Sequence, residues 1–413
     1  MRTLIRHINC LVGVQDPKQP LRKEALAQLP SIKDAFLLLE DDVILRYGVM
    51  NALDLSASDV DQVIDAKDRF VLPAWCDSHT HLVFAATREE EFVDKLKGAT
   101  YAEIAAKGGG ILNSARKVQA CSEDELFQGA LLRLKAAILL GTGAMEIKSG
   151  YGLQTEAEIK MLRVIKRLKE QTPIPIRSNF LGAHAFPVEY KDDREGYLRL
   201  LIEEMLPRIA AEQLADYIDV FCERGFFSPD ETSLILAAAA AHGLRPKIHA
   251  NQLSVSGGVE VGVRHDALSV DHLECMDDAA IDCLSAADTI GTLLPGCSLF
   301  LRAPYAPARA LIDSGAAIAL ASDFNPGSAP SYNMNLVVSL ACTQMRLLPE
   351  ESVNAATING AFAMELADRV GSIAAGKKAN LIFTKPMSSL AYLPYSFGEN
   401  VVERVMINGK FYL

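Results

Sequence analysis

Short apolar runs alternate with longer amphipathic stretches through the middle of the chain. Strand-like runs of this kind begin at Val71. Capping-box signals that start helices stand between several of them: Ser122 with Glu125, Thr155 with Glu158, and Ser228 with Glu231. Such alternation is typical of a parallel sheet with crossover helices, and eight repeats close into a barrel. The sequence therefore predicts an α/β fold, a (β/α)8 TIM barrel, over residues 71–370. Its strands end near His81, Lys148, His184, Glu223, His249, His272, Pro295 and Asp323.

The two ends of the chain have a different pattern. Strand character covers residues 3–14, 35–47 and 62–64, around a polar insertion at 15–33, and it returns at 379–383 and 401–413. Asn408 and Gly409 are typical of a type I′ hairpin turn. We expect residues 1–70 plus 371–413 to form one small composite β-sandwich. Helices at 331–346 and 352–366 should close the barrel domain.

Polar residues at the predicted strand ends indicate a metal site. If residues 70–77 form a strand that continues, His79 and His81 project to the same side, because side chains two apart share a face. His249 and Asp323 end two later strands, and active sites of such barrels lie at the carboxyl ends of the strands. Three imidazoles and one carboxylate suit one divalent metal, zinc or iron, with a position left for water.

Composition narrows the function to small-molecule chemistry. Of 413 residues, 50% are apolar and 23% are charged, which is ordinary for a soluble protein with a packed core. The net charge of −11, without any block of Lys or Arg, argues against nucleic acid as a partner. The eight cysteines form no Cys-x-x-Cys pair, and no signal peptide or membrane span is evident. We expect a cytoplasmic protein with reduced thiols, and a homodimer as the commonest closed assembly.

Seven motifs stand out along nearly the whole chain. They are Asp77–Ala85, Arg88–Phe92, Glu146–Gly152, Leu181–His184, Lys247–Gln252, Asp271–His272 and Ser322–Ser328. These motifs resemble the amidohydrolase superfamily, and this resemblance implies metal-dependent hydrolysis. The finer motifs are similar to those of the enzymes of histidine degradation that open the ring of 4-imidazolone-5-propanoate to give N-formimidoyl-L-glutamate.

Several residues match the needs of that substrate. Arg88 can bind its carboxylate bidentately, and Tyr151 lies in a glycine-rich loop that allows close approach of the backbone to a ligand. Tyr101 precedes glycines at 108–110 that could serve as the hinge of a lid. His184 is placed to donate to the amide oxygen as charge develops there. The resemblance adds further substrate-lining positions, namely Asn325, Gly327 and Ser328.

The expected mechanism is attack of a metal-activated water on the ring carbonyl. Asp323 takes the proton of the water, and either Asp323 or His272 delivers a proton to the departing ring nitrogen. Family members can carry Glu at position 252 to orient the water. This chain has Gln252, which can form hydrogen bonds and cannot act as a base.

Three alternatives stay open from the sequence. A second metal would need a bridging carboxylate or modified lysine at a matching strand end. Lys148 ends the second strand rather than the fourth, whereas Glu223 on the fourth strand could bridge, although one metal is favoured. The chain could instead be another cyclic amidohydrolase, or deaminate a purine or pyrimidine, although Arg88 with Tyr151 favours an acidic substrate. It could also be a metal-free assembly protein, which the intact ligand set argues against.

Overall fold

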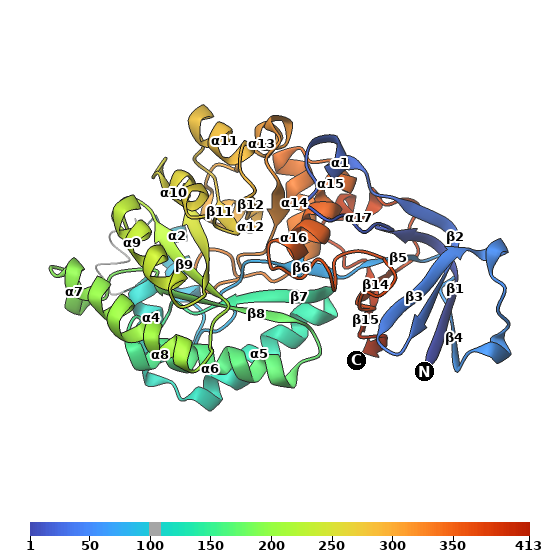
Figure 1. Ribbon diagram of the computed structural model, residues 1–413, viewed down its shortest axis with the longest axis horizontal. Coiled ribbons are helices and arrows are strands. Elements are labelled where there is room, and N and C mark those ends of the chain that lie inside the picture. Colours follow the sequence, from blue (N-terminus) through green and yellow to red (C-terminus); the bar gives the residue numbers. More distant parts are fainter. Residues whose placement is uncertain (99–108) are drawn as a thin grey trace.

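The computed structural model describes residues 1–98 and 109–413, and its centre is a barrel (Figure 1). Eight strands each pair in parallel with the next in the order of the chain. Thr80 and Phe324 form an isolated parallel bridge that joins the first strand end to the last, which confirms the predicted barrel. The strands are β6 (Trp75–Asp77), β7 (Thr142–Lys148), β8 (Ile176–Ala183), β9 (Tyr217–Cys222), β10 (Arg245–Ala250), β11 (Ser269–His272), β12 (Ile290–Leu293) and β13 (Ile318–Leu320).

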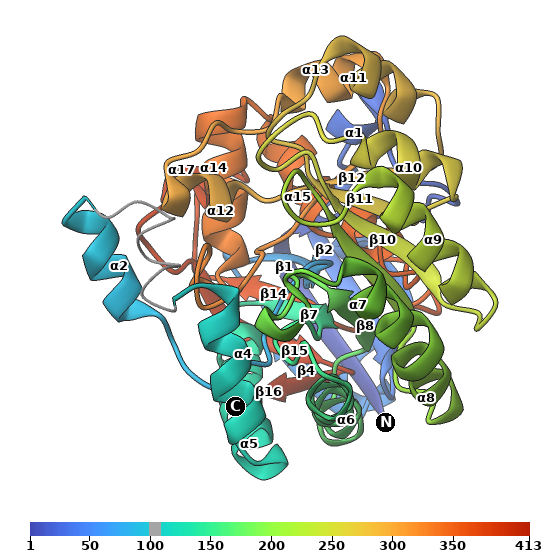
Figure 2. The ribbon, with the colours of Figure 1, turned by 90° about the vertical axis from the view of Figure 1, so that its left-hand side faces the viewer.

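Helices surround this barrel (Figure 2). Ser122 and Ser228 form the predicted capping boxes with Glu125 and Glu231, so helices α5 and α9 begin where the sequence places them. The helices are α1 (Lys23–Ala27), α2 (Glu89–Leu96), α4 (Ile111–Ala120), α5 (Glu123–Leu139), α6 (Thr155–Gln171), α7 (Arg194–Arg199), α8 (Leu206–Ala211), α9 (Pro229–Ala240), α10 (Gly258–Arg264), α11 (Asp278–Ser285), α12 (Pro295–Leu301), α13 (Ala308–Ser314), α14 (Met334–Met345), α15 (Pro349–Ala356), α16 (Ile358–Phe362) and α17 (Tyr392–Tyr395).

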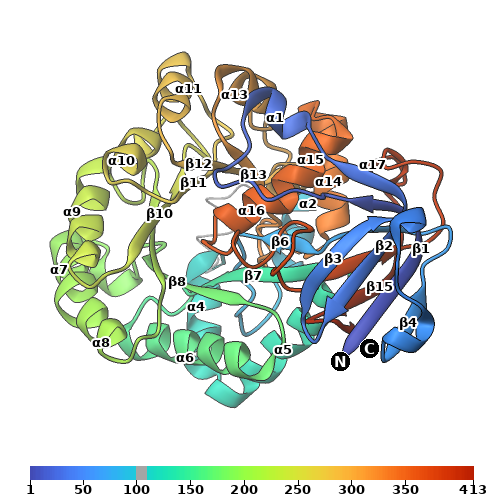
Figure 3. The ribbon, with the colours of Figure 1, turned by 45° about the vertical axis from the view of Figure 1, so that its right-hand side comes forward.

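A second sheet unites the two ends of the chain, as predicted (Figure 3). Its order is β16-β15-β14-β5-β1-β2-β3, with β4 also paired to β1. Asn408 and Gly409 have φ values of 50° and 74°, the backbone that a type I′ turn requires between β15 and β16. We propose the division into residues 1–70 plus 371–413 and residues 71–370 for the two units, with residues 71–73 moved to the outer sheet because the strand Phe70–Pro73 pairs there. The strands are β1 (Arg2–Val12), β2 (Ser31–Glu40), β3 (Val43–Val49), β4 (Gln62–Asp65), β5 (Phe70–Pro73), β14 (Leu381–Thr384), β15 (Val402–Ile407) and β16 (Lys410–Tyr412).

Three predicted elements are wrong in their bounds. The expected strand at 70–77 is two strands, because β5 pairs with β1 and β14 in the outer sheet, whereas β6 starts the barrel. The run at 35–47 is a hairpin that turns at Asp41, where φ is 53°. The helix expected at 352–366 breaks at Thr357, which has φ −119° and ψ −88°. The division of the run at 70–77 depends on pairing with strands distant in the sequence, which local propensity does not encode.

Apolar side chains fill the barrel and the space under its helices. Trp75, Phe180 and Phe227 are fully buried there, and a separate cluster around Leu37, Phe383 and other apolar side chains forms the core of the outer sheet. Within 1–98 and 109–413, no helix is both long enough and apolar enough to cross a membrane.

Candidate metal centre and substrate cavity

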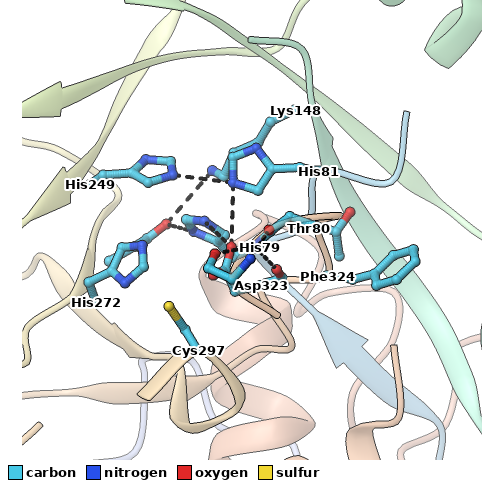
Figure 4. A network of polar contacts seen from close by, with 12 residues as sticks. His79, Thr80, His81, Lys148, His249, His272, Cys297, Asp323 and Phe324 are labelled. Atoms are coloured by element: carbon cyan, nitrogen blue, oxygen red, sulfur yellow. Dashed lines mark hydrogen bonds and ion pairs between the residues drawn. The ribbon is translucent and has the colours of Figure 1, made fainter. Parts of the chain in front are cut away.

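The four predicted metal ligands meet at one end of the barrel (Figure 4). His79 and His81 follow β6, His249 lies in β10, and Asp323 follows β13. Asp323 Oδ1 lies 3.5 Å from His79 Nε2 and 3.4 Å from His81 Nε2. His81 Nε2 also lies 3.3 Å from His249 Nε2. Three ring nitrogens and one carboxylate therefore face the same small space.

Two buried carboxylates orient the ligand rings. Asp271 Oδ2 lies 2.6 Å from His79 Nδ1, and Asp219 Oδ1 lies 3.0 Å from His249 Nδ1. Each ring donates its Nδ1 proton to a carboxylate, so each Nε2 carries a lone pair that faces the centre. His79 Nε2 has no hydrogen-bond partner among the described residues. These converging lone pairs fit a divalent cation.

The charge states of the ligands agree with that fit. Burial lowers the pKa of His79 well below its ordinary value and that of His81 to about 4, so both rings are neutral at pH 7. Burial alone would raise the pKa of Asp323, but the hydrogen bond with His81 and the nearby imidazoles lower it overall. Neutral imidazoles and an ionised carboxylate are the forms that bind metal.

The backbone at the centre adopts rarely populated conformations. Asp323 has φ 53°, His272 has φ 91° and Asn251 has φ 53°, and each stands at or just after a barrel strand. Positive φ costs a non-glycine residue roughly 1–3 kcal/mol and persists where the surrounding structure enforces it. The fold therefore holds these side chains in place at a cost in stability.

Lys148 lies in a fully buried ion network beneath the ligands. Its Nζ lies 2.7 Å from Asp219 Oδ2 and 3.8 Å from Asp271 Oδ2, so it joins the two carboxylates that orient the rings. Burial opposes its charge, but Asp219 and Glu146 raise the pKa of Lys148 overall. A lysine engaged in this way is a charge partner, and it does not reach out to bridge two metals.

Glu223 is also engaged elsewhere. Its Oε2 accepts a hydrogen bond from Leu253 N at 2.9 Å, and its Oε1 accepts bonds from Arg224 N and the Ser254 hydroxyl. Glu223 therefore fixes the loop after β10. Both bridging groups considered for a second metal thus have other roles.

A cavity of about 440 Å³ opens above the metal centre. The structure brings nearly all predicted substrate residues to it. Tyr101, together with Gly108 of the proposed lid hinge, lies outside the described residues. The predicted residues that line the cavity are His81, Arg88, Tyr151, His184, His249, Gln252, His272, Asp323, Asn325, Gly327 and Ser328.

Arg88 carries unused hydrogen-bond donors in this cavity. Its side chain is only 11% exposed, and Nε and Nη1 have no hydrogen-bond partner among the described residues. Its ion pair with Glu91 is long, at 3.7 Å from Nε to Glu91 Oε2. Glu91 Oε1 in turn accepts hydrogen bonds from Gly110 N and Asn113 Nδ2. The guanidinium is therefore poised to bind an anion.

Gly327 provides the space that the Arg88 side chain occupies. A Cβ at position 327 would lie 1.2 Å from Arg88 Nη2, so Gly327→Ala must displace the guanidinium. Because the end of an arginine can move, we expect the variant to fold and to raise KM about tenfold, equivalent to about 1.4 kcal/mol. Steady-state kinetics with the proposed substrate checks this. Gly296→Ala, whose Cβ would meet only Ser322 O at 3.4 Å, should behave as wild type, and an unchanged KM in Gly327→Ala would refute the placement.

Glu158 shapes the loop that carries Tyr151. The sequence assigns Glu158 to a capping box with Thr155, but its carboxylate instead accepts hydrogen bonds from Gly150 N, Gly152 N and Leu153 N. The capping prediction is wrong because these three backbone donors compete for the same oxygens. The loop places the Tyr151 ring 5.9 Å from the His81 ring, and burial raises the pKa of Tyr151, so its hydroxyl stays protonated.

His184 lies beside Tyr151, with its ring stacked on that of His81 at 5.3 Å. Its Nδ1 lies 3.0 Å from Gly150 O, a carbonyl that can only accept a hydrogen bond. Burial lowers the pKa of His184 well below its ordinary value. The ring is thus neutral, with its proton on Nδ1 and a lone pair on Nε2.

The side chain of Asn325 fixes the loop that follows β13. Asn325 Oδ1 accepts hydrogen bonds from Gly327 N and Ser328 N, at 2.8 and 2.7 Å, and its Nδ2 donates to Asp323 O. Asn325 lines the cavity, but its polar atoms are occupied. It therefore positions Asp323 and Gly327.

Sequence reasoning missed several residues of the site. Asp219 is not among the site residues predicted from the sequence. Its signal is that it is the one charged residue in the otherwise apolar strand β9. Lys95 of α2 lines the cavity near Arg88, and Phe221 and Phe226 form part of its apolar wall. These apolar residues carry no distinguishing sequence signal, since aromatic residues are common in any core.

Comparison with known proteins shows the family to which this chain belongs. The model of the amidohydrolase family matches residues 70–412. An imidazolonepropionase of Flavobacterium johnsoniae is 53% identical over 411 residues, covering 99% of this chain and 100% of that protein. One of Geobacillus thermodenitrificans is 43% identical, covering 95% and 93%. An adenosine deaminase structure from Xanthomonas campestris with bound zinc shares the fold, with a TM-score of 0.69 at 17% identity, covering 100% and 92%. The chain therefore belongs to the imidazolonepropionases of the amidohydrolase family.

Proposed function

We propose that this chain hydrolyses the ring amide bond of 4-imidazolone-5-propanoate to give N-formimidoyl-L-glutamate, a step of histidine degradation. The observation that carries the proposal is Arg88, a buried cation with unused donors in the same cavity as the metal ligands. A substrate with a carboxylate beside a cyclic amide fits this cavity, because the carboxylate can bind Arg88 while the amide lies at the metal ligands. A neutral purine or pyrimidine ring offers no carboxylate to the unused Nε and Nη1 donors of Arg88.

His79, His81, His249 and Asp323 would hold one divalent ion, zinc or iron. When bound, it supplies a Lewis acid that lowers the pKa of a water molecule. His79 and His249 are kept in the binding tautomer by Asp271 and Asp219. Elemental analysis of the purified protein distinguishes zinc from iron.

Asp323 accepts the proton of the attacking water, since its carboxylate is ionised and faces the ligand nitrogens. His272 is the proton donor to the departing ring nitrogen. Burial alone would lower the pKa of His272, but Glu274, 3.4 Å from its Nδ1, raises it overall. The water adds to the ring carbonyl carbon, and the bond from that carbon to the adjacent ring nitrogen breaks as the nitrogen takes the proton from His272. The carbonyl carbon becomes a carboxylate and the nitrogen becomes the end of the formimidoyl group, both within the single product N-formimidoyl-L-glutamate.

The tautomer of His184 changes the role that the sequence assigns to it. A neutral ring that donates from Nδ1 to Gly150 O offers only a lone pair at Nε2, so His184 accepts a hydrogen bond from a ring N–H of the substrate. The donor to the substrate oxygen is then the hydroxyl of Tyr151. A donating His184 would require the charged imidazolium form.

Gln252 orients the attacking water through its amide. Its Nε2 donates to Cys297 Sγ at 3.5 Å, and the residue lines the cavity. We expect Gln252→Ala to lower kcat/KM about tenfold, because one neutral hydrogen bond contributes about 0.5–1.5 kcal/mol while the proton acceptor Asp323 is still present. Gln252→Glu, which keeps an oxygen at that position, should retain most activity. Complete loss of turnover in the alanine variant would show that Asp323 is not the base.

We further propose a cytoplasmic location and a homodimer. The small-metabolite substrate supports the first, and the frequency of closed two-fold assemblies supports the second. Light scattering of the eluted protein measures its mass and tests the dimer.

A further inference from the structure

A second group of metal-binding side chains lies beside the primary ligands. His272 at the end of β11, Glu274 in the following loop and Cys297 of α12 each offer a ligand atom, and these atoms lie within 4.8 Å of one another. All three residues are buried, with exposures of 2%, 7% and 1%. Figure 4 shows the Cys297 side chain directed toward the space between His272 and Asp323.

Glu274 has an unsatisfied oxygen in this group. Its Oε1 accepts a hydrogen bond from the Ser298 hydroxyl at 3.3 Å and faces His272 Nδ1 at 3.4 Å. Its Oε2 is buried without a hydrogen-bond partner anywhere in 1–98 or 109–413. An unpaired buried carboxylate oxygen is costly, roughly 1–3 kcal/mol or more for a charged group. A cation beside it would remove that cost.

We propose that His272, Glu274 and Cys297 form a second binding site for a thiophilic divalent cation, Zn²⁺ or Cd²⁺, adjacent to the primary centre. Nitrogen, oxygen and sulfur donors from three side chains leave a fourth tetrahedral position for water. The thiol releases its proton to solvent on binding, and thiolate plus carboxylate balance the two positive charges. Mg²⁺ is excluded because it prefers six oxygen ligands.

Occupation of this site should inhibit the enzyme, a consequence that rests on the proposed function. His272 would hold the cation with the ring that the mechanism uses to deliver a proton. Excess Zn²⁺ or Cd²⁺ would therefore reduce turnover while the primary ligands keep their own ion. Mg²⁺ at the same concentration should have no effect.

The binding claim is tested without substrate. Holoenzyme with one equivalent of its own metal is dialysed against Cd²⁺, and both metals are counted while the ultraviolet cadmium–thiolate absorption is recorded. We expect one further equivalent with a thiolate band. Cys297→Ser should lose the band and bind the second ion at least about tenfold more weakly, because loss of even a residue that only orients a ligand costs about 10–100-fold in metal affinity. Cys275→Ser is the matched control, because its partly exposed thiol lies outside the three-residue group.

Glu274→Gln provides a second variant if Cys297→Ser does not fold. It keeps the thiol and should bind the second ion at least about tenfold more weakly than Cys275→Ser does. Binding of no further equivalent, exchange of the original metal for cadmium, or a thiolate band that persists in Cys297→Ser would each overturn the proposal. Failure of the ring-opening activity would not alter these counts, so the two proposals fail separately.

Discussion

His249→Ala is expected to abolish both stoichiometric metal and turnover. Three remaining ligands leave the site open, and Asp219 loses the ring that its Oδ1 contacts at 3.0 Å. Removal of even a supporting contact costs about 10–100-fold in metal affinity, so removal of a direct ligand should cost more. Without the Lewis acid the attacking water returns toward its ordinary pKa of about 15.7, and we expect turnover to fall at least about a thousandfold.

Metal analysis and kinetics of the purified variant check this, with circular dichroism to confirm folding. His242→Ala is the matched control, since His242 is exposed just after α9 and should leave both quantities unchanged. Full metal occupancy with normal activity in His249→Ala would remove His249 from the ligand set.

Arg88→Met is expected to lower kcat/KM about a hundredfold without a change in metal content. The side chain keeps its apolar contacts but loses a bidentate, charge-assisted contact to the propionate, in which each bond contributes about 1.5–3 kcal/mol. A loss of roughly 3 kcal/mol corresponds to that factor. Arg88 directly precedes α2, and Lys97 directly follows it. Lys97→Met removes this exposed cation and should change kcat/KM little.

The defect of Arg88→Met should depend on the charge of the ligand. An amide analogue of the propionate, already a poor substrate for the wild type, offers no charge to the guanidinium and should lose far less on mutation. Equal losses for the charged and neutral compounds would show that Arg88 supports its loop and does not bind the carboxylate.

The ligand set could be predicted because strand ends are visible in the sequence. His79, His81, His249 and Asp323 each follow an apolar run, and in a parallel barrel such positions meet at one end. The outer sheet was also predictable, since Asn408 and Gly409 mark its last hairpin. The wrong bounds of the strand predicted at 70–77 depended on partners distant in the sequence. The division between β5 and β6 arises because β14, some 300 residues later, pairs with the first of them.

Charge states in the site could not be predicted for the same reason. The tautomer of His184 is set by Gly150 O, and the roles of Lys148 and Glu158 are set by the groups that the fold brings to them. Sequence patterns place a side chain on a strand or loop. They do not state which hydrogen-bond acceptor lies 3 Å away.

The central claim is most directly tested by incubating the metal-loaded protein with 4-imidazolone-5-propanoate. Loss of the ring absorbance is followed, and the product is identified by mass spectrometry. The proposal predicts metal-dependent loss of the absorbance with formation of N-formimidoyl-L-glutamate in equal amount. A metal-loaded, folded protein that leaves this compound intact and instead deaminates a purine or pyrimidine ring would contradict it.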